Sequence, residues 1–273
     1  MIRDVIINSI EEYEEHVNNK SLRFFNFMHD ENKIMSLYRG QKVDFQLYPK
    51  LCRLYETYHG KYMFDSDVKT FKEMETELLE EFKLNLNSFN LYQLRRNDWF
   101  FLALGQHYGL PTRLLDWTSD PLIALWFAFN EERYYDKEEK IYRIVWIMTF
   151  ENNKTKYPQQ QLNNFRGIEV FEAPKLDKRI INQKAWFSVQ SVNYRTIEEH
   201  KNDIMPDTTP SFEPINQIYA FNDYFFEKVM ITDTEKNRID IMRKLNDKGL
   251  NYHYIYPDKI SELCNELENK LIK

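Results

Sequence analysis

Polar and charged side chains interrupt one of the most apolar and aromatic stretches of the 273-residue sequence, residues 103–128. Burying such groups costs free energy unless they are paired, so the stretch holds either a structural network or a binding site. In a structural network, Arg113 would pair with Asp116, and Asp120 would cap a buried helix. In a binding site, the turn before that helix would offer its free backbone N–H groups to an anion. The residues concerned are Gln106, His107, Tyr108, Thr112, Arg113, Asp116, Trp117, Thr118, Ser119 and Asp120.

A second cluster, Tyr38-Arg39-Gly40, lies at the end of an apolar run that predicts a strand over 34–39. Arg39 carries a planar, permanently charged fork that suits phosphate or carboxylate. Gly40 allows a ligand or another backbone to approach closely. On this feature alone, an arginine paired to an acid at a strand end is the favoured interpretation.

The third cluster, residues 178–183, precedes the apolar run AWFSV. The amide of Gln183 donates and accepts hydrogen bonds together, which suits a ribose hydroxyl or another amide. The structural alternative is a glutamine that satisfies a sheet edge.

Apolar periodicity and capping signals predict the elements that position these clusters. Asp120 is an N-cap candidate, and Pro121 stands at the first helical position, where its missing N–H costs nothing. Residues 198–217 are polar and interrupted by proline, which is typical of a mobile segment. The whole pattern indicates one α+β domain over 1–273. Helices are predicted at 9–17, 67–89, 99–108, 122–129, 234–248 and 258–271, and strands at 34–39, 141–150, 185–189, 228–232 and 251–256.

Composition excludes several classes of protein. The formal net charge of −6 gives no general attraction to nucleic acid or anionic membrane. Two cysteines make neither a disulfide framework nor a zinc pattern, so no metal is expected. Neither a signal core nor a membrane span is evident, and we expect a cytoplasmic protein. The phosphate-binding glycine loops, the hydrolase elbow and the zinc-protease motif are missing, and the carboxylates are too scattered for a metal nuclease.

At these three clusters the chain resembles the FRG domain family, which is named for an aromatic-Arg-Gly motif, here Tyr38-Arg39-Gly40. The resemblance is strongest in GQHYGLPTRLLDWTSDPLIALWFA, 105–128, and returns in KRIINQKAWFSV, 178–189. It also includes LYPKLCR, 47–53, and ETELLEEF, 75–82. One departure is Lys184, because the family usually places Gly soon after the Gln.

A weaker resemblance links the chain to ADP-ribosyltransferases of the Arg–Ser–Glu type. It implies a mixed-sheet core with surrounding helices and NAD as a substrate. By position, Arg39 would hold the diphosphate, and Thr118 and Ser119 would brace the nicotinamide pocket. Gln183 falls near the place where those enzymes keep a catalytic Glu, and a Gln carries no charge. Asp116, Glu172 or Glu227 would then have to supply the carboxylate.

The function expected from this resemblance is cleavage of the nicotinamide–ribose bond, with transfer of ADP-ribose to a macromolecule or to water. Small proteins of this sort resemble effectors of toxin or phage-defence systems. A non-catalytic module that binds a nucleotide or a peptide in the same cleft is the alternative, and a purely structural cluster is a third. The expected catalytic residues are Arg39, Asp116 and Gln183. The expected binding residues are Tyr38, Gly40, Gln106, His107, Tyr108, Thr112, Arg113, Trp117, Thr118, Ser119 and Asp120. We expect Arg113, Asp116 and the 118–120 turn to form one wall of a cleft, with Arg39 and Gln183 opposite.

Overall fold

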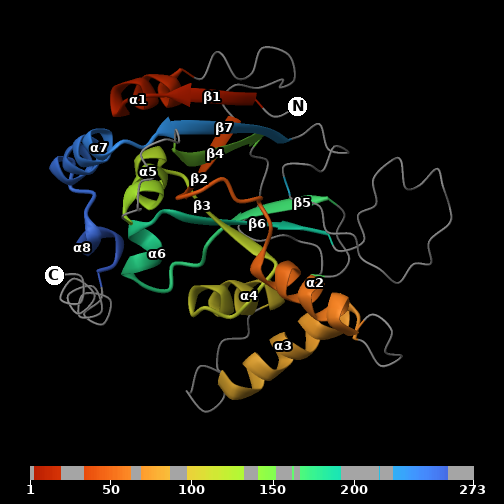
Figure 1. Ribbon diagram of the computed structural model, residues 1–273. Helices are drawn as coiled ribbons and strands as arrows, with labels where there is room; N and C mark the ends of the chain where they lie inside the picture. The colour runs from red at the N-terminus through yellow and green to blue at the C-terminus, as the bar shows by residue number, and fades with distance from the viewer. Residues whose placement is uncertain are drawn as a thin grey trace, which may run out of the picture.

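The computed structural model describes residues 3–19, 34–62, 69–86, 97–131, 141–151, 162, 167–191, 215 and 224–257 (Figure 1). Its centre is a seven-stranded sheet in the order β1-β7-β4-β2-β3-β6-β5. Only β1 runs parallel to its neighbour β7, and the other pairs are antiparallel, so the sheet is mixed and the predicted α+β class is confirmed. The strands are β1 (Arg3–Ile7), β2 (Ile34–Gln41), β3 (Leu114–Thr118), β4 (Tyr142–Glu151), β5 (Ile168–Glu172), β6 (Ala185–Gln190) and β7 (Tyr224–Thr232).

The sheet is split in its middle. Every residue of β2 pairs with β4, and every residue of β3 pairs with β6. By contrast, β2 and β3 are joined at one pair, Tyr38 with Thr118. Beyond that pair the two half-sheets separate, and the residues that follow Tyr38 face those that precede Thr118 across a gap.

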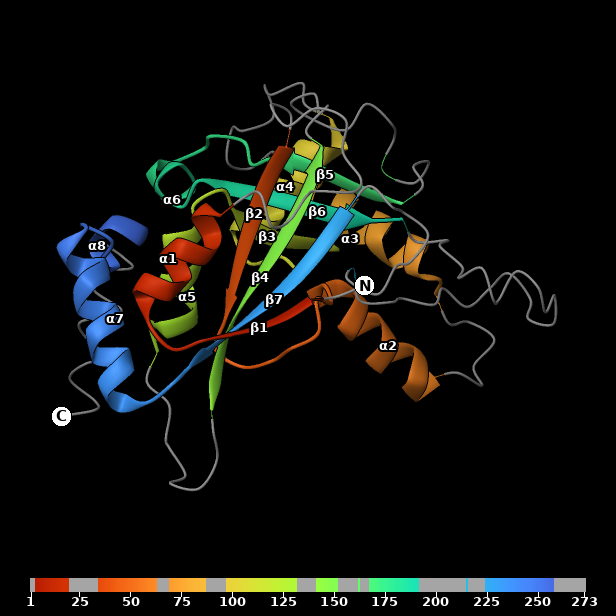
Figure 2. The same ribbon diagram turned by 90° about the horizontal axis from the view of Figure 1, so that it is seen from above.

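Helices cover both faces of the sheet (Figure 2). One face carries α1 (Ile10–Asn18), α5 (Pro121–Phe129), α7 (Glu235–Asp247) and α8 (Tyr252–Ile255), which share one apolar core with β2, β4 and β7. The other side carries α2 (Lys50–Tyr62), α3 (Phe71–Leu86) and α4 (Asp98–His107), and α6 (Lys178–Asn182) precedes β6. Helix α5 is buried on almost every side, which explains why its sequence is apolar all round.

Gly40 allows α5 to lie directly against β2. A Cβ atom at this position would stand 1.9 Å from the carbonyl oxygen of Ala124 and 2.8 Å from the amide nitrogen of Ala128. Of the two roles expected for Gly40, close approach of another backbone is therefore the one that the fold uses.

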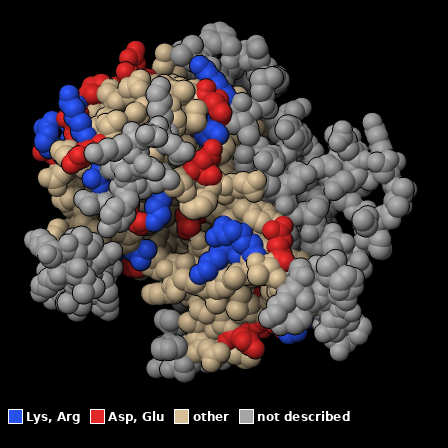
Figure 3. Space-filling model, in the orientation of Figure 1, with Lys and Arg blue, Asp and Glu red and all other residues tan. Residues whose placement is uncertain are grey.

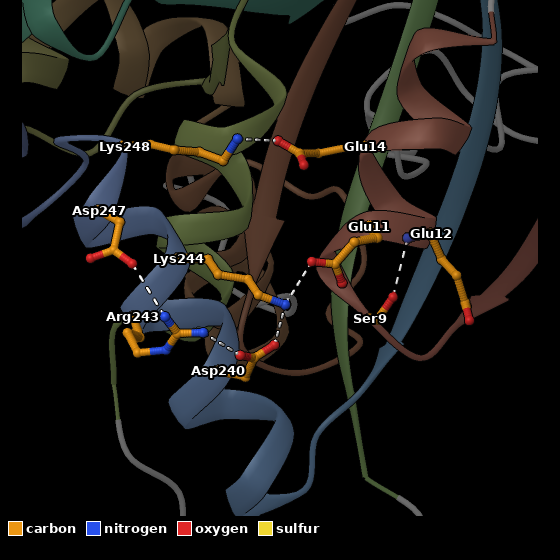
Figure 4. Close-up of polar contacts among 9 residues, drawn as sticks. All are labelled: Ser9, Glu11, Glu12, Glu14, Asp240, Arg243, Lys244, Asp247 and Lys248. Carbon is orange, nitrogen blue, oxygen red and sulfur yellow. Dashed lines mark hydrogen bonds and ion pairs between the residues drawn. The ribbon is translucent and has the colours of Figure 1, made fainter.

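Ion pairs join α1 to α7 on the outer face (Figure 4). Lys244 reaches Glu11 at 2.6 Å, and Lys248 reaches Glu14 at 2.8 Å. Ser9 caps α1 by accepting a hydrogen bond from the amide of Glu12. These contacts lie outside the apolar core in which Tyr13 of α1 and Ile241 of α7 are both buried.

Most of the predicted elements that fall within the described residues are present, and the cap expected at Asp120 is among them. Asp120 caps α5 with Pro121 in its first turn, and Gly109 and Gly249 adopt the left-handed conformation after α4 and α7. The strand predicted over 251–256 is wrong. The side chain of Asn251 accepts from the amide of Tyr254 and starts the short helix α8 there instead. The helix predicted over 258–271 lies outside the described residues, as does nearly all of the segment 198–217.

Candidate functional site

A cleft of about 350 Å³ opens where the two half-sheets separate. Strands β2, β3 and β6 and helices α4, α5 and α6 all contribute to its walls. Most of the predicted site residues line it. They are Tyr38, Arg39, Gly40, Gln106, His107, Asp116, Trp117, Thr118 and Gln183.

Arg39 bridges the gap between the half-sheets. Its Nη1 donates to the backbone carbonyl of Asp116 at 2.7 Å and lies 3.8 Å from the Asp116 Oδ2 atom. Among the described residues, none accepts a hydrogen bond from the buried Nε. Burial lowers the pKa of the Arg39 guanidinium, and the Asp116 carboxylate opposes that effect. The side chain is 25% exposed, so one end of this cation remains open to the cleft.

Asp116 is held by a relay of hydrogen bonds that starts in the core. The amide of Leu114 donates to the Thr112 hydroxyl oxygen, and that hydroxyl donates to Gln106 Oε1 at 2.6 Å. This fixes the Gln106 amide so that its Nε2 donates to Asp116 Oδ2 at 2.8 Å. The Asp116 side chain is 58% exposed, so it is anchored and still accessible.

The far wall of the cleft comes from α6 and the residues around it. His107 at the end of α4 lies 2.6 Å from Asp177, the N-cap of α6. Gln183 donates to the carbonyl of Ile255 at 3.2 Å, which ties this wall to α8. The guanidinium of Arg179 lies 4.7 Å from the centre of the Tyr256 ring, a cation–π distance.

Arg113 does not belong to the cleft, and its expected pairing with Asp116 is wrong. It is 1% exposed, and its Nε lies 2.8 Å from Glu75 Oε1 on α3. Its other nitrogens reach the carbonyls of Leu162 and Gln190. Burial raises the pKa of Glu75, and the Arg113 charge opposes that shift. Arg113 is therefore held in the core between the start of β3 and α3, while Asp116 lines the cleft.

Four further predicted residues lie outside the walls of the cleft: Tyr108, Thr112, Ser119 and Asp120. Tyr108 is exposed and contacts His107 edge to face, with 4.9 Å between ring centres. Thr112 is buried behind the cleft wall, and its hydroxyl contacts Gln106, which does line the cleft. Asp120 caps α5, and its second carboxylate oxygen lies 2.7 Å from the Lys184 ammonium.

The unusual Lys184 occupies a position that favours glycine. Its φ angle is +47°, in the left-handed region that L side chains rarely adopt. Its ion pair with Asp120 and the bond from the Ser119 amide to its carbonyl offset part of that strain.

Of the three carboxylates considered for the missing Glu, only Asp116 lines the cleft. Glu172 lies 3.5 Å from Lys175 at the end of β5. Glu227 is fully buried in β7, with Arg3 at 3.7 Å and His16 at 3.1 Å. Neither Glu172 nor Glu227 lines the cleft.

Sequence reasoning missed Arg179, Phe127 and Phe187 in the walls of the cleft. Arg179 belongs to the cluster 178–183, in which only Gln183 was expected to bind a ligand, and its place in that cluster was the available signal. Phe127 and Phe187 lie in apolar runs, and nothing in the sequence distinguishes a residue of the cleft wall from a residue of the core there.

Within the described ranges, no three His, Cys, Asp or Glu side chains come together as metal ligands would. In the same ranges, no helix has the length and apolarity that crossing a bilayer requires.

Comparison with models of known families supports the resemblance to the FRG domain. The model of the FRG domain matches residues 35–137, which include β2, β3, the helices between them and α5. No curated protein and no solved structure matches the chain. The cleft walls formed by Arg39 and Asp116 thus lie within the matched region, and the chain carries an FRG domain over residues 35–137.

Proposed function

We propose that the chain is an ADP-ribosyltransferase-like protein that binds NAD and cleaves the bond between nicotinamide and ribose. The observation that supports this most is the convergence of Arg39, Asp116 and Gln183 on one cleft at the split of the sheet. Arg39 and Asp116 are 77 residues apart in the sequence, yet the guanidinium of one contacts the backbone of the other.

Each residue would have a distinct role. Arg39 binds the diphosphate, because its fork matches phosphate oxygens and its buried Nε has no acceptor among the described residues. Gln183 binds a ribose hydroxyl with its amide. Asp116 places a negative charge where the ribose becomes cationic.

The reaction itself needs little covalent chemistry from the protein. The bond between C1′ and the nicotinamide nitrogen breaks, and its electron pair neutralises the pyridinium ring. The cation left at C1′ is trapped by water or by a side chain of an acceptor, which then loses a proton. Catalysis would rest on positioning and on stabilisation of the cation by Asp116.

The second candidate function is a non-catalytic module that binds a nucleotide or a peptide. Two features favour it. Gln183 stands where a carboxylate is expected, and the Asp116 carboxylate is already engaged by Gln106 and lies near Arg39. A carboxylate with these partners stabilises a cation less than a free one does.

Release of nicotinamide from NAD, followed by chromatography, tests the proposal. We expect release by the wild type and about 10²–10³-fold slower release by Asp116→Asn, the order found when one preorganised electrostatic group is removed. Arg39→Lys should raise the KM, since an ammonium cannot reproduce the bidentate fork. Arg243→Gln, on the exposed face of α7, is the matched control and should leave the rate unchanged.

Two outcomes would contradict the enzyme proposal. No release by the wild type, with cell lysate added as a source of acceptor, would favour the binding module. A large loss of melting temperature in Asp116→Asn would instead indicate a structural role for the cluster. We further propose that the protein acts in the cytoplasm as a toxin or phage-defence effector. This part of the proposal depends on the release of nicotinamide by the wild type.

A further inference from the structure

A second cavity of about 720 Å³ adjoins the cleft on the side of α2. The two share Arg39, Gly40 and Phe127, so Arg39 lies at their junction. Ligand pockets usually measure about 300–1,000 Å³, and each of these cavities falls within that range.

Most of the charges that line the second cavity are already neutralised. Lys42 pairs with Glu131, and Asp44 lies 3.0 Å from Lys228. Arg53 on α2 lines the same cavity, and no ion pair joins it to another described residue. Arg53 therefore remains without an ionic partner among the described residues, and Arg39, which lies 3.8 Å from the Asp116 carboxylate, presents a second guanidinium to the same cavity. Figure 3 shows basic side chains gathered near the start of α2, in the middle of this face of the molecule.

The position of Arg53 is set by the rest of its helix. Leu51, Cys52 and Tyr55 are buried and hold α2 in the core, which leaves Arg53 on the exposed side. One of its nitrogens donates to the carbonyl of Tyr48, and this bond orients the guanidinium. The charge of Arg53 also contributes to the lowered pKa of Arg39, so the two cations are close enough to repel. Bringing two like charges together in this way is unfavourable until an anion lies between them.

Aromatic rings line the cavity beyond these two cations. Phe45 is 59% exposed, which is unusual for so apolar a side chain, and Tyr48 and Tyr256 lie on the same walls. Tyr256 also stacks on Arg179 of the first cleft. Exposed rings beside a cationic site suit the stacking of a nucleotide base.

We infer that Arg53 is the second guanidinium of a diphosphate site. The diphosphate lies between Arg39 and Arg53, with one arm of the ligand in each cavity. This inference rests on the proposed function for the identity of the ligand as NAD, but the two-arginine site itself requires only a nucleoside diphosphate.

Binding measured by calorimetry tests the inference, with ADP, AMP and inorganic pyrophosphate as probes. The variants are Arg53→Gln and Arg53→Lys, and the matched control is Lys50→Gln, an exposed cation in the first turn of the same helix. We expect Arg53→Gln to weaken ADP and pyrophosphate by about tenfold to a hundredfold, as for loss of a charge-assisted hydrogen bond, and AMP by less. Arg53→Lys should recover part of the loss, and unchanged melting temperatures would show that the variants fold.

The outcomes separate this inference from the proposed function. Equal binding of ADP to the wild type and Arg53→Gln would overturn the role of Arg53, even if the wild type releases nicotinamide from NAD. Binding that depends on Arg53 without any nicotinamide release would uphold the two-arginine site and overturn the enzyme. Absence of binding by ADP and by pyrophosphate to the wild type would also overturn the inference.

Discussion

At the scale of single residues, the candidate site depends on side chains that never touch the cleft. Thr112 is fully buried, and its hydroxyl donates to Gln106 Oε1, which turns the Gln106 Nε2 toward Asp116. In a site of this kind, the side chains that would contact a ligand lie at the surface, and the side chains that orient them lie in the core.

Thr112→Val tests this relay, because valine keeps the shape and removes the hydroxyl. The change leaves the Leu114 amide and Gln106 Oε1 without their partner, and we expect a loss of about 1–3 kcal/mol in the free energy of unfolding in urea. Nicotinamide release should fall as well. Thr57→Val, on the exposed side of α2, is the control and should change neither quantity. An unchanged rate in Thr112→Val would show that Gln106 does not orient Asp116.

At the scale of elements, α5 packs directly against β2, and residues of both elements line the first cleft. Asp120 caps α5, and Gly40 lies under the middle of the same helix. Both residues belong to motifs identified from the sequence. The helix can approach β2 only because residue 40 has no side chain.

Gly40→Ala should therefore be strongly destabilising. The new methyl group would overlap the backbone of α5, and overpacking of this kind costs about 1–3 kcal/mol or more. Gly249→Ala is the comparison, since nothing lies within 4 Å there and the cost comes from its positive φ alone. A smaller loss in Gly40→Ala than in Gly249→Ala, measured by thermal unfolding, would contradict the packing argument.

The sequence predicted elements best where a local signal marks their ends. Ser9, Asp120 with Pro121, and Gly249 each act within a few residues, and the helices that they mark were predicted. The alternation in NYHYIY imitates a half-buried strand, and the cap at Asn251 proved stronger than that pattern. The partner of Arg113 could not be predicted, because Glu75 lies on α3, Arg113 directly precedes β3, and only tertiary packing brings them together. Most of the cleft residues were predicted by motif, but strand β3, which carries Asp116, Trp117 and Thr118, was not predicted.

At the scale of the whole molecule, buried charge joins the layers. The Arg113–Glu75 pair connects β3 to α3, and both side chains are almost completely buried. Removing one partner of such a pair leaves the other charge in the core.

Arg113→Met should cost about 3–5 kcal/mol, and the double variant Arg113→Met/Glu75→Leu should regain most of that loss. Unfolding in urea measures both. Because Arg113 lies outside the cleft, nicotinamide release per folded molecule should stay unchanged in the double variant. A double variant as unstable as the single one would show that the ion pair is not the reason for the loss.

The split in the sheet has a consequence for how such a protein can diverge. In a continuous sheet, each strand constrains the register of the next, so a change at one position is felt by its neighbours. Here one residue pair joins the two halves. The facing edges of β2 and β3 are thus free to vary independently, and new ligand preferences can be acquired along them while the core of each half stays as it is.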